Sequence, residues 1–340
     1  MKEALLYDKL EGRDVRCRLC AHNCRISEGH KGLCHVRENR DGVLYSLVYG
    51  RTISENVDPI EKKPLYHFYP GSRSFSIATP GCNFRCAWCQ NWEISQMPRE
   101  RHLIAGREMA PEQIVAAAVR TGSRSIAYTY TEPTIFFEYS YDTARLARDA
   151  GIVNVYVSNG YMSAEMLELF HPWLDAANID LKSFRDETYR KHVGARLQPV
   201  LDSLKRLRFY GVWIEVTTLV IPGVNDDPDE LREIAEFIAT ELGVDTPWHI
   251  SRFFPQYKLN TVPPTPPATL YRAEEIGRAA GLRYVYLGNL AAKAHTRCPN
   301  CGLVVVARNG YGVGELRVNG AGCCPDCGTA IAGIWGTGRI

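Results

Sequence analysis

The sequence contains no long apolar segment. None of its 340 residues falls in a run that approaches the roughly 20 apolar residues needed to cross a bilayer. The first residues, MKEALLYDKLEGRDVRC, also lack the unbroken apolar core of a secretory signal. We therefore expect a cytoplasmic protein that does not enter a membrane.

The sequence also lacks an excess of charge of either sign. Lys and Arg total 40 against 38 for Asp and Glu, a formal net charge of +2. No overall field therefore argues for nucleic acid or an anionic membrane surface as a partner. An RNA-modifying enzyme is an alternative, but the Cys-rich ends of the chain show no interleaved basic and aromatic residues that would favour RNA.

Cysteine, by contrast, is plentiful, with 12 residues in the chain. In a reducing compartment cysteines are poor candidates for disulfides and better ones for ligands of a metal ion or cluster. They fall into three groups along the chain, which are Cys17, Cys20, Cys24 and Cys34; Cys82, Cys86 and Cys89; and Cys298, Cys301, Cys323, Cys324 and Cys327.

Between about residues 74 and 287, short β-rich runs alternate with longer helical ones. This alternation is typical of βα units around a parallel sheet. Six such runs begin at residues 74, 125, 152, 176, 212 and 248, and a candidate seventh begins at residue 282. The pattern does not separate a partial barrel from an open, doubly wound sheet.

Both folds place the active site at the carboxyl ends of the parallel strands. In this sequence those ends carry polar side chains after each of the six runs. We therefore predict a polar ring around three thiols, formed by Cys82, Cys86, Cys89, Thr131, Glu132, Ser158, Asn159, Asp180, Lys182, Thr217, Thr218, His249 and Arg252.

The central group has three cysteines, in the order Cys82-x3-Cys86-x2-Cys89. Four cysteines commonly close a zinc site or an iron–sulfur cluster, since each cluster iron takes its own thiolate. Three leave one iron open, which suits a site that binds a substrate or cofactor directly. The alternatives are a zinc knuckle or a four-ligand cluster completed from elsewhere in the chain.

This motif, with Trp88 just before its last cysteine, resembles the signature of the radical S-adenosylmethionine (SAM) family. The resemblance implies that the three cysteines hold a [4Fe-4S] cluster whose fourth iron chelates the amino and carboxylate groups of SAM. It also implies electron transfer that cleaves the bond between sulfur and C5′ of SAM and yields a 5′-deoxyadenosyl radical, which abstracts hydrogen. An electron donor such as flavodoxin or ferredoxin is then expected.

The resemblance extends to the segment TYTEPT, residues 129–134, which stands where the family usually has Gly-Gly-Glu-Pro. Thr131 and Glu132 would take the amino group of SAM. The sequence departs from the family where Tyr130 and Thr131 replace the two glycines, whereas Glu132 and Pro133 are retained. This departure puts the backbone contact to SAM in doubt.

Three further segments, VSNGY, IDLKS and WIEVTTLVIPGVNDD, resemble parts of glycyl-radical-enzyme activases. By that likeness a monovalent cation would lie near Asp180. The residues expected at the SAM site are Trp88, Thr131, Glu132, Ser158, Asn159, Asp180, Lys182 and His249. The structural alternatives are an ion-paired surface carboxylate for Glu132, a salt bridge between Asp180 and Lys182 on one strand face, and a satisfied core histidine for His249.

The whole arrangement, from about residue 15 to 340, is most similar to the radical SAM member of the AmmeMemoRadiSam group. That likeness implies Memo-like and Amme-like proteins as partners. It also implies an α/β fold with three parts, namely a Cys-rich segment (1–70), a partial (β/α)6 TIM-like barrel (71–294) and a ribbon-like four-cysteine module (295–340). The activase likeness suggests a protein or peptide substrate, although the ring would equally accept a small molecule. A metal-bound scaffold that does not cleave SAM is the alternative from another functional class.

The N-terminal cysteines follow the spacing Cys17-x2-Cys20-x3-Cys24-x9-Cys34. Four thiolates in a segment with little apolar content suggest that a metal organises it. The spacing fits structural zinc and an auxiliary iron–sulfur cluster equally well.

Two knuckles, CPNCG and CPDCG, form the C-terminal group. They predict a tetrahedral site made of Cys298, Cys301, Cys324 and Cys327, for zinc or for rubredoxin-type iron. Zinc is favoured because the residues between the knuckles are typical of a β-hairpin, as in zinc ribbons. Cys323 and the terminal GIWGTGRI have no role in this interpretation.

Overall fold

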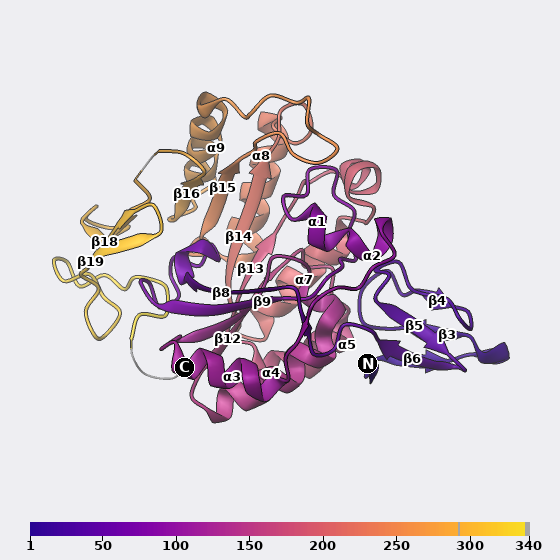
Figure 1. Ribbon diagram of the computed structural model, residues 1–340. Coiled ribbons are helices and arrows are strands. Elements are labelled where there is room, and N and C mark those ends of the chain that lie inside the picture. The colour runs from indigo at the N-terminus through magenta and orange to yellow at the C-terminus, as the bar shows by residue number, and fades with distance from the viewer. Residues whose placement is uncertain (292, 337–340) are drawn as a thin grey trace.

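The computed structural model describes residues 1–291 and 293–336, and its centre is an eight-stranded sheet (Figure 1). The strands β9 to β16 of this sheet are all parallel, and β8 pairs antiparallel with β9. From one edge to the other the strands are β16 (Val285–Gly288), β15 (Trp248–Arg252), β14 (Trp213–Val220), β13 (Ala176–Asp180), β12 (Val153–Ser158), β11 (Ser125–Tyr128), β9 (Arg73–Ala78) and β8 (Ser54–Pro59).

This sheet confirms the predicted α/β class with a parallel sheet, and it includes the candidate seventh strand as β16. The parallel strands stand in chain order, as they do in a barrel. The two edge strands, β16 and β8, do not pair with each other in the described part of the chain, so the sheet stays open. β8 comes from the segment before residue 70, and the division into three parts stays a prediction.

The helices of the core connect successive parallel strands. They are α3 (Pro111–Arg120), α4 (Phe137–Asp149), α5 (Ala164–Phe170), α7 (Gln198–Phe209), α8 (Pro228–Phe237) and α9 (Pro267–Ala279), with the shorter α1 (Trp92–Ser95), α2 (Met97–Glu100) and α6 (Asp186–Thr188). Single turns of 3-10 or π helix are η1 (Glu11–Arg13), η2 (Ile60–Lys62), η3 (Pro133–Phe136), η4 (His171–Trp173), η5 (Tyr189–Val193) and η6 (Ile238–Leu242).

Local sequence explains where these helices begin. Pro111 occupies the first turn of α3, where its missing N–H costs nothing, and the Gln113 side chain accepts a hydrogen bond from the backbone N–H of Ala110 at 2.8 Å. At α8, the Asp227 carboxylate accepts hydrogen bonds from the backbone N–H groups of Asp229 and Glu230, both at 3.0 Å. These caps satisfy amides that have no partner within the helix.

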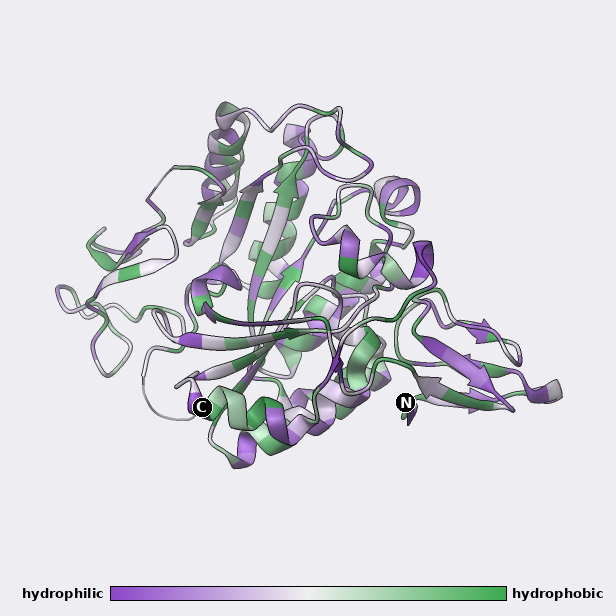
Figure 2. Ribbon diagram, in the orientation of Figure 1, coloured by the Kyte–Doolittle hydropathy of each residue, from purple (hydrophilic) through white to green (hydrophobic). Residues whose placement is uncertain are grey.

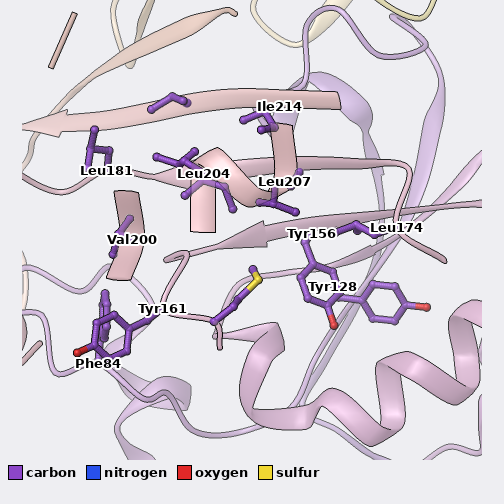
Figure 3. Close-up of a cluster of buried hydrophobic side chains, with 14 of the residues drawn as sticks. Phe84, Tyr128, Tyr156, Tyr161, Leu174, Leu181, Val200, Leu204, Leu207 and Ile214 are labelled. Carbon is purple, nitrogen blue, oxygen red and sulfur yellow. The ribbon is translucent and has the colours of Figure 1, made fainter. Parts of the chain in front are cut away.

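Apolar and polar residues alternate along the helices in Figure 2, and the apolar ones are largely buried; in α3 the buried residues include Ile114, Val115 and Ala118. Figure 3 shows part of the resulting core, in which Tyr128 and Tyr156 from adjacent strands lie near Leu174, while Leu204 and Leu207 of α7 face Ile214 of β14. All of these side chains are buried. The sheet therefore forms a rigid floor for the loops at its carboxyl edge.

Two small all-β regions lie on opposite sides of this core in Figure 1. The N-terminal one contains the sheets β1-β6-β5 and β2-β3-β4, and the C-terminal one contains the predicted hairpin, β18-β19, with β17 beside it. Their bounds are β1 (Lys2–Glu3), β2 (Tyr7–Lys9), β3 (Val15–Cys17), β4 (Arg25–Ile26), β5 (Arg37–Arg40), β6 (Val43–Ser46), β17 (Thr296–Arg297), β18 (Val304–Asn309) and β19 (Gly312–Leu316); a further pair is β7 (Arg51–Thr52) with β10 (Arg107–Glu108).

No helix in residues 1–291 and 293–336 combines the length and the apolar character needed to cross a membrane.

Candidate functional site

A cavity of about 680 Å³ opens at the carboxyl ends of the parallel strands. The structure brings the three central cysteines and all eight residues expected at the SAM site to its wall. These residues are Cys82, Cys86, Cys89, Trp88, Thr131, Glu132, Ser158, Asn159, Asp180, Lys182 and His249. A volume of this size is within the range of small-molecule and cofactor sites.

Two members of the predicted ring do not line this cavity. The Thr218 hydroxyl is buried and accepts a hydrogen bond from the Trp248 indole N–H at 3.0 Å, whereas the neighbouring Thr217 does line the cavity. Successive residues of a strand face opposite sides of the sheet, so only one of the pair can reach the site. The Arg252 guanidinium donates instead to the backbone oxygen of Thr265 at 2.7 Å.

The three central thiols lie on the loop between β9 and α1. The backbone N–H of Phe84 donates to Sγ of Cys82 at 3.3 Å, and the Ser95 hydroxyl oxygen lies 3.2 Å from Sγ of Cys89. Gly81 lies near the start of this loop and has φ of 106°. A Cβ at this position would lie 2.8 Å from Cγ1 of Val36. The loop therefore needs glycine at its first turn.

The spacing of these thiols does not suit a single metal ion. Sulfur atoms that bind one zinc ion at about 2.3 Å lie about 3.8 Å apart. Among the described residues, the Sγ atoms of Cys82, Cys86 and Cys89 are not all within 4.8 Å of one another. The site thus resembles the wall of a larger, polynuclear centre with one side open to the cavity.

Burial strongly affects the protonation of these thiols. It raises the pKa of Cys82 well above its ordinary value, and it raises the pKa of Cys86 to about 12 even though the Lys182 ammonium acts in the opposite direction. Both thiols are therefore protonated at neutral pH when no metal is bound. Ligand binding as thiolate must release these protons.

Glu132 organises the strand ends around the cavity. It is buried, and its carboxylate accepts hydrogen bonds from the hydroxyl of Ser158 and the backbone N–H of Asn159, both at 2.8 Å, and from the N–H of Thr134 at 3.0 Å. Burial raises the pKa of Glu132, and these hydrogen bonds oppose the rise. The surface-carboxylate alternative is therefore wrong, because the side chain is buried between two strand ends.

Tyr130 adopts a left-handed backbone conformation, with φ of 63°. This is the first of the two positions where the resembled family has glycine, the residue that adopts positive φ without strain. Tyr130 therefore adopts a conformation that glycine, the family's residue at this position, would adopt without strain. The Tyr130 carbonyl accepts a hydrogen bond from the Asn91 amide at 2.7 Å, and the Thr131 hydroxyl donates to the oxygen of Thr79 at 2.8 Å.

Asp180 and Lys182 form the salt bridge that the sequence analysis gave as the structural alternative to SAM contact. The distance between Oδ2 and Nζ is 2.6 Å. Strand β13 ends at Asp180, so Lys182 lies just beyond the strand, yet both residues line the cavity. Burial alone would lower the pKa of Lys182, but the charges of Asp180 and Cys86 raise it. A permanent positive charge therefore stands beside the Cys86 sulfur.

His249 has a buried partner, as expected for a core histidine, and still lines the cavity. Its Nε2 lies 2.6 Å from Oε2 of Glu215, whose carboxylate also accepts the backbone N–H groups of Tyr66 at 2.9 Å and His67 at 2.7 Å. Burial alone would raise the pKa of Glu215, but its hydrogen bond with His249 lowers it. Glu215 therefore ties the segment before β9 to β14.

Sequence reasoning missed Lys63, which also lines the cavity. Its Nζ lies 2.7 Å from Oδ2 of Asp58, which also accepts a hydrogen bond from the Tyr130 hydroxyl. Burial lowers the pKa of Lys63 to about 8. The segment EKKPLY follows β8, the antiparallel edge strand that the sequence analysis did not predict, so a search of the parallel strand ends does not find it. Its paired lysines beside a proline were the available signal.

The N-terminal cysteines lie together at a second, smaller pocket. Cys17, Cys20, Cys24 and Cys34 all line it, beside apolar side chains that include Leu19 and Ile26. No three of their Sγ atoms lie within 4.8 Å of one another in the described structure. The four thiols therefore share one pocket, but their sulfur atoms are farther apart than the ligands of a single metal ion.

The C-terminal cysteines are arranged differently. Cys298, Cys301, Cys324 and Cys327 have Sγ atoms that all lie within 4.8 Å of one another. Two of the separations are 3.5 Å, between Cys298 and Cys327, and 3.7 Å, between Cys301 and Cys324. These are the edges of a tetrahedron around one metal ion. Cys323 is not part of this group.

Comparisons with known proteins point to the family whose motif the three central cysteines resemble. The sequence model of the radical SAM superfamily matches residues 76–238. An uncharacterised protein of Methanocaldococcus jannaschii is 48% identical over 310 residues, which cover 91% of this chain and 92% of that protein. The pyruvate formate-lyase-activating enzyme of Clostridium pasteurianum is 22% identical over 201 residues, or 56% of this chain and 81% of that enzyme.

Among solved structures, a radical SAM methyltransferase from Sphaerobacter thermophilus matches with a TM-score of 0.51 at 15% identity. The match covers 65% of this chain and 67% of that chain. At this level of identity the likeness shows the fold alone.

Proposed function

This chain belongs to the radical SAM superfamily, and we propose that it cleaves SAM reductively and uses the resulting radical to abstract hydrogen from a substrate. The observation that carries the proposal is the meeting of three thiols and eight polar or aromatic residues, predicted from sequence, at one cavity. When bound, a [4Fe-4S] cluster on Cys82, Cys86 and Cys89 would supply the electron that breaks the bond between sulfur and C5′ of SAM.

The residues present fit such a cluster. Their sulfur atoms are too widely spaced for a single ion, and the loop leaves one side of the thiol group facing the cavity. Hydrogen bonds to the sulfurs, such as that from the Asn159 amide to Cys82 at 3.8 Å and that from the backbone N–H of Phe84, tune the reduction potential of iron–sulfur sites. Lys182 adds a positive charge beside Cys86, which stabilises the thiolate.

The cavity residues then have distinct tasks. Glu132 fixes the ends of β11 and β12 against each other, so that Ser158 and Asn159 face the cavity in a defined position. The Asp180 and Lys182 pair offers one charge of each sign to a zwitterionic ligand such as SAM. We assign Trp88, Thr131 and His249 to the cofactor wall on their positions in the cavity.

We propose a protein or peptide as the hydrogen donor, because a relative that matches over 81% of its own length is named pyruvate formate-lyase-activating enzyme. Turnover of an isolated small molecule is the contrary outcome. Flavodoxin or ferredoxin is the proposed electron donor. Association with Memo-like and Amme-like proteins, and membership of the AmmeMemoRadiSam group, stay predictions.

For the C-terminal four-cysteine group we propose zinc. The sulfur separations of 3.5 and 3.7 Å are close to the edge of a zinc–sulfur tetrahedron, about 3.8 Å. Gly302 and Gly328, with φ of 76° and 72°, make the tight turn that follows each knuckle. Rubredoxin-type iron has similar geometry and would reveal itself by colour and by its iron content.

The test is anaerobic reconstitution with iron and sulfide, followed by incubation with SAM and dithionite and chromatographic assay of 5′-deoxyadenosine. The wild type should form 5′-deoxyadenosine and Cys86→Ala should not. Cys323→Ala, which removes a cysteine that belongs to none of the three proposed ligand sets, is the matched control and should behave like the wild type. A reconstituted cluster that never cleaves SAM would leave the metal-bound scaffold as the better interpretation.

A further inference from the structure

The four N-terminal thiols come from separate segments of two small sheets, β2-β3-β4 and β1-β6-β5. Cys17 ends β3, Cys20 and Cys24 lie on the loop between β3 and β4, and Cys34 precedes β5. All four thiols line the same pocket. Their convergence, from positions that no disulfide or helix links, indicates a common ligand.

The spacing of these thiols excludes the simplest ligand, a single ion. Four sulfurs around one zinc lie about 3.8 Å apart, as the C-terminal group of the same chain nearly does. Within residues 1–291 and 293–336, no three of the N-terminal Sγ atoms meet even a limit of 4.8 Å. The cysteines of the radical SAM motif show the same wide spacing.

Two buried donors at this pocket have no hydrogen-bond partner among the described atoms. They are Nε of Arg37 and Nδ2 of Asn83, on side chains that are 2% and 3% exposed. Both residues line the pocket. Buried N–H groups are almost always paired, and acceptors on a ligand bound in this pocket would pair these two. An iron–sulfur cluster brings inorganic sulfides as well as thiolates, and sulfur atoms of such clusters accept hydrogen bonds.

We propose that Cys17, Cys20, Cys24 and Cys34 hold an auxiliary iron–sulfur cluster rather than zinc. His22, a further metal-binding residue type at this pocket, is already engaged, since its Nε2 lies 2.9 Å from the backbone oxygen of Asn83. The four thiolates therefore form the ligand set. Apolar neighbours, including Leu19, Ile26 and Ile135, shield the centre from water.

The auxiliary cluster lies directly behind the radical SAM loop. Asn83, the residue after Cys82, lines the auxiliary pocket, and its Oδ1 accepts a hydrogen bond from Nδ2 of Asn159 at 2.8 Å. The same Asn159 amide contacts Sγ of Cys82. A Cβ on Gly81, the residue before Cys82, would lie 3.5 Å from the backbone oxygen of Cys34. Residues adjacent to Cys82 thus contact the auxiliary site, which predicts magnetic coupling between the two centres when both are reduced.

The first test is a count of metal and acid-labile sulfide in anaerobically reconstituted wild-type protein. An auxiliary cluster adds two or four irons and as many sulfides to the radical SAM cluster, giving about six or eight of each per chain, with about one zinc. About four irons, four sulfides and two zinc ions would overturn the proposal. Sulfide is the decisive number, because rubredoxin-type iron at the C-terminal group adds iron without sulfide.

The second test assigns the extra cluster to its cysteines by Mössbauer and electron paramagnetic resonance spectroscopy. Cys17→Ser with Cys34→Ser should remove two or four irons and leave zinc unchanged, whereas Cys298→Ser with Cys324→Ser should remove zinc and leave iron unchanged. Cys323→Ser is the control. An N-terminal double variant that loses zinc and keeps all its iron would refute the assignment. These readouts do not depend on SAM cleavage, so failure of the proposed activity and failure of this proposal are distinguishable.

Discussion

The two four-cysteine regions at the ends of the chain have the same number of thiols and different geometry. The C-terminal thiols approach one another to 3.5 and 3.7 Å, whereas no three N-terminal thiols in the described structure lie within 4.8 Å. The difference comes from the surrounding backbone: two matching knuckles present the C-terminal sulfurs, and segments of two different small sheets present the N-terminal ones. Cysteine count predicts that a metal binds, and the backbone decides how large the centre is.

The two regions also differ in how they join the core. Apolar residues of the N-terminal region, such as Val15, Leu19 and Val36, belong to the same buried cluster as the central sheet. The C-terminal module packs in a separate, smaller cluster, in which Val305 and Ile331 meet Tyr284 and Tyr286 at the edge of the central sheet. We therefore expect the N-terminal region to unfold with the core and the C-terminal module to loosen separately.

The largest expected effect tests the N-terminal junction. Arg37 and Glu138, 2% and 0% exposed, form an ion pair that joins β5 to α4. Arg37→Met leaves the Glu138 carboxylate buried without its charge partner, which typically costs about 3–5 kcal/mol. Denaturant unfolding of the reconstituted protein should show this loss in a single transition.

Two matched variants sharpen this prediction. Arg37→Met with Glu138→Leu removes both charges and should recover much of the loss, although Glu138 also accepts the backbone N–H of Leu5 at 3.0 Å. Arg13→Met breaks an exposed pair with Asp41 and should cost less than about 1 kcal/mol. Equal losses for Arg37→Met and Arg13→Met would show that the N-terminal region is not joined to the core as described.

The second prediction tests the polar junction of the C-terminal module. His67 is buried, its Nδ1 lies 2.6 Å from the oxygen of Ala332, and its Nε2 lies 2.6 Å from the Tyr286 hydroxyl. Burial lowers the pKa of His67 to about 4 from an ordinary 6.5. Because the unfolded chain binds this proton more readily, the neutral ring contributes stability above pH 6.5 that is lost as the pH falls toward 4.

Between pH 8 and pH 5, this linkage corresponds to about 2 kcal/mol of unfolding free energy. His67→Gln, which does not titrate, should be less stable at pH 8 but should lose about 2 kcal/mol less than the wild type over that interval. The measurement is denaturant unfolding at several pH values, with the exposed His30→Gln as the control. Parallel pH curves for the wild type and His67→Gln would contradict the prediction.

The sequence predicted the part of the site that follows from strand order. Residues after successive parallel strands meet at one edge, so Glu132, Asn159 and Asp180 could be placed together before any coordinates. Which residue of a neighbouring pair faces the cavity depends on strand register, and Thr218 shows that this can fail. The fold followed in the same way, from the spacing of apolar runs.

Other features required the tertiary structure. Lys63 lines the cavity, and Glu215 of β14 accepts the backbone N–H of His67, because the segment between β8 and β9 packs there. No local pattern reports where such a segment packs. The choice between zinc and a cluster at Cys17 and its partners likewise depends on distances between residues of different strands. The segment around Trp335 had no role in the sequence interpretation. Its role is in packing, since the Trp335 ring lies 5.2 Å from the ring of His67.

The smallest expected effect concerns a hydrogen-bond partner of one C-terminal thiol. The Thr329 hydroxyl oxygen lies 3.2 Å from Sγ of Cys327, and hydrogen-bond partners of metal ligands typically change affinity by about 10- to 100-fold. Thr329→Val should therefore weaken zinc binding about tenfold, measured by competition with a chromogenic chelator, whereas Thr329→Ser should not. Iron and sulfide contents should stay unchanged in both variants, because Thr329 is remote in sequence and belongs to the other region. A loss of iron in Thr329→Val would mean that the two regions are coupled through the core. The N-terminal region and the C-terminal module would then not differ in how they join the core.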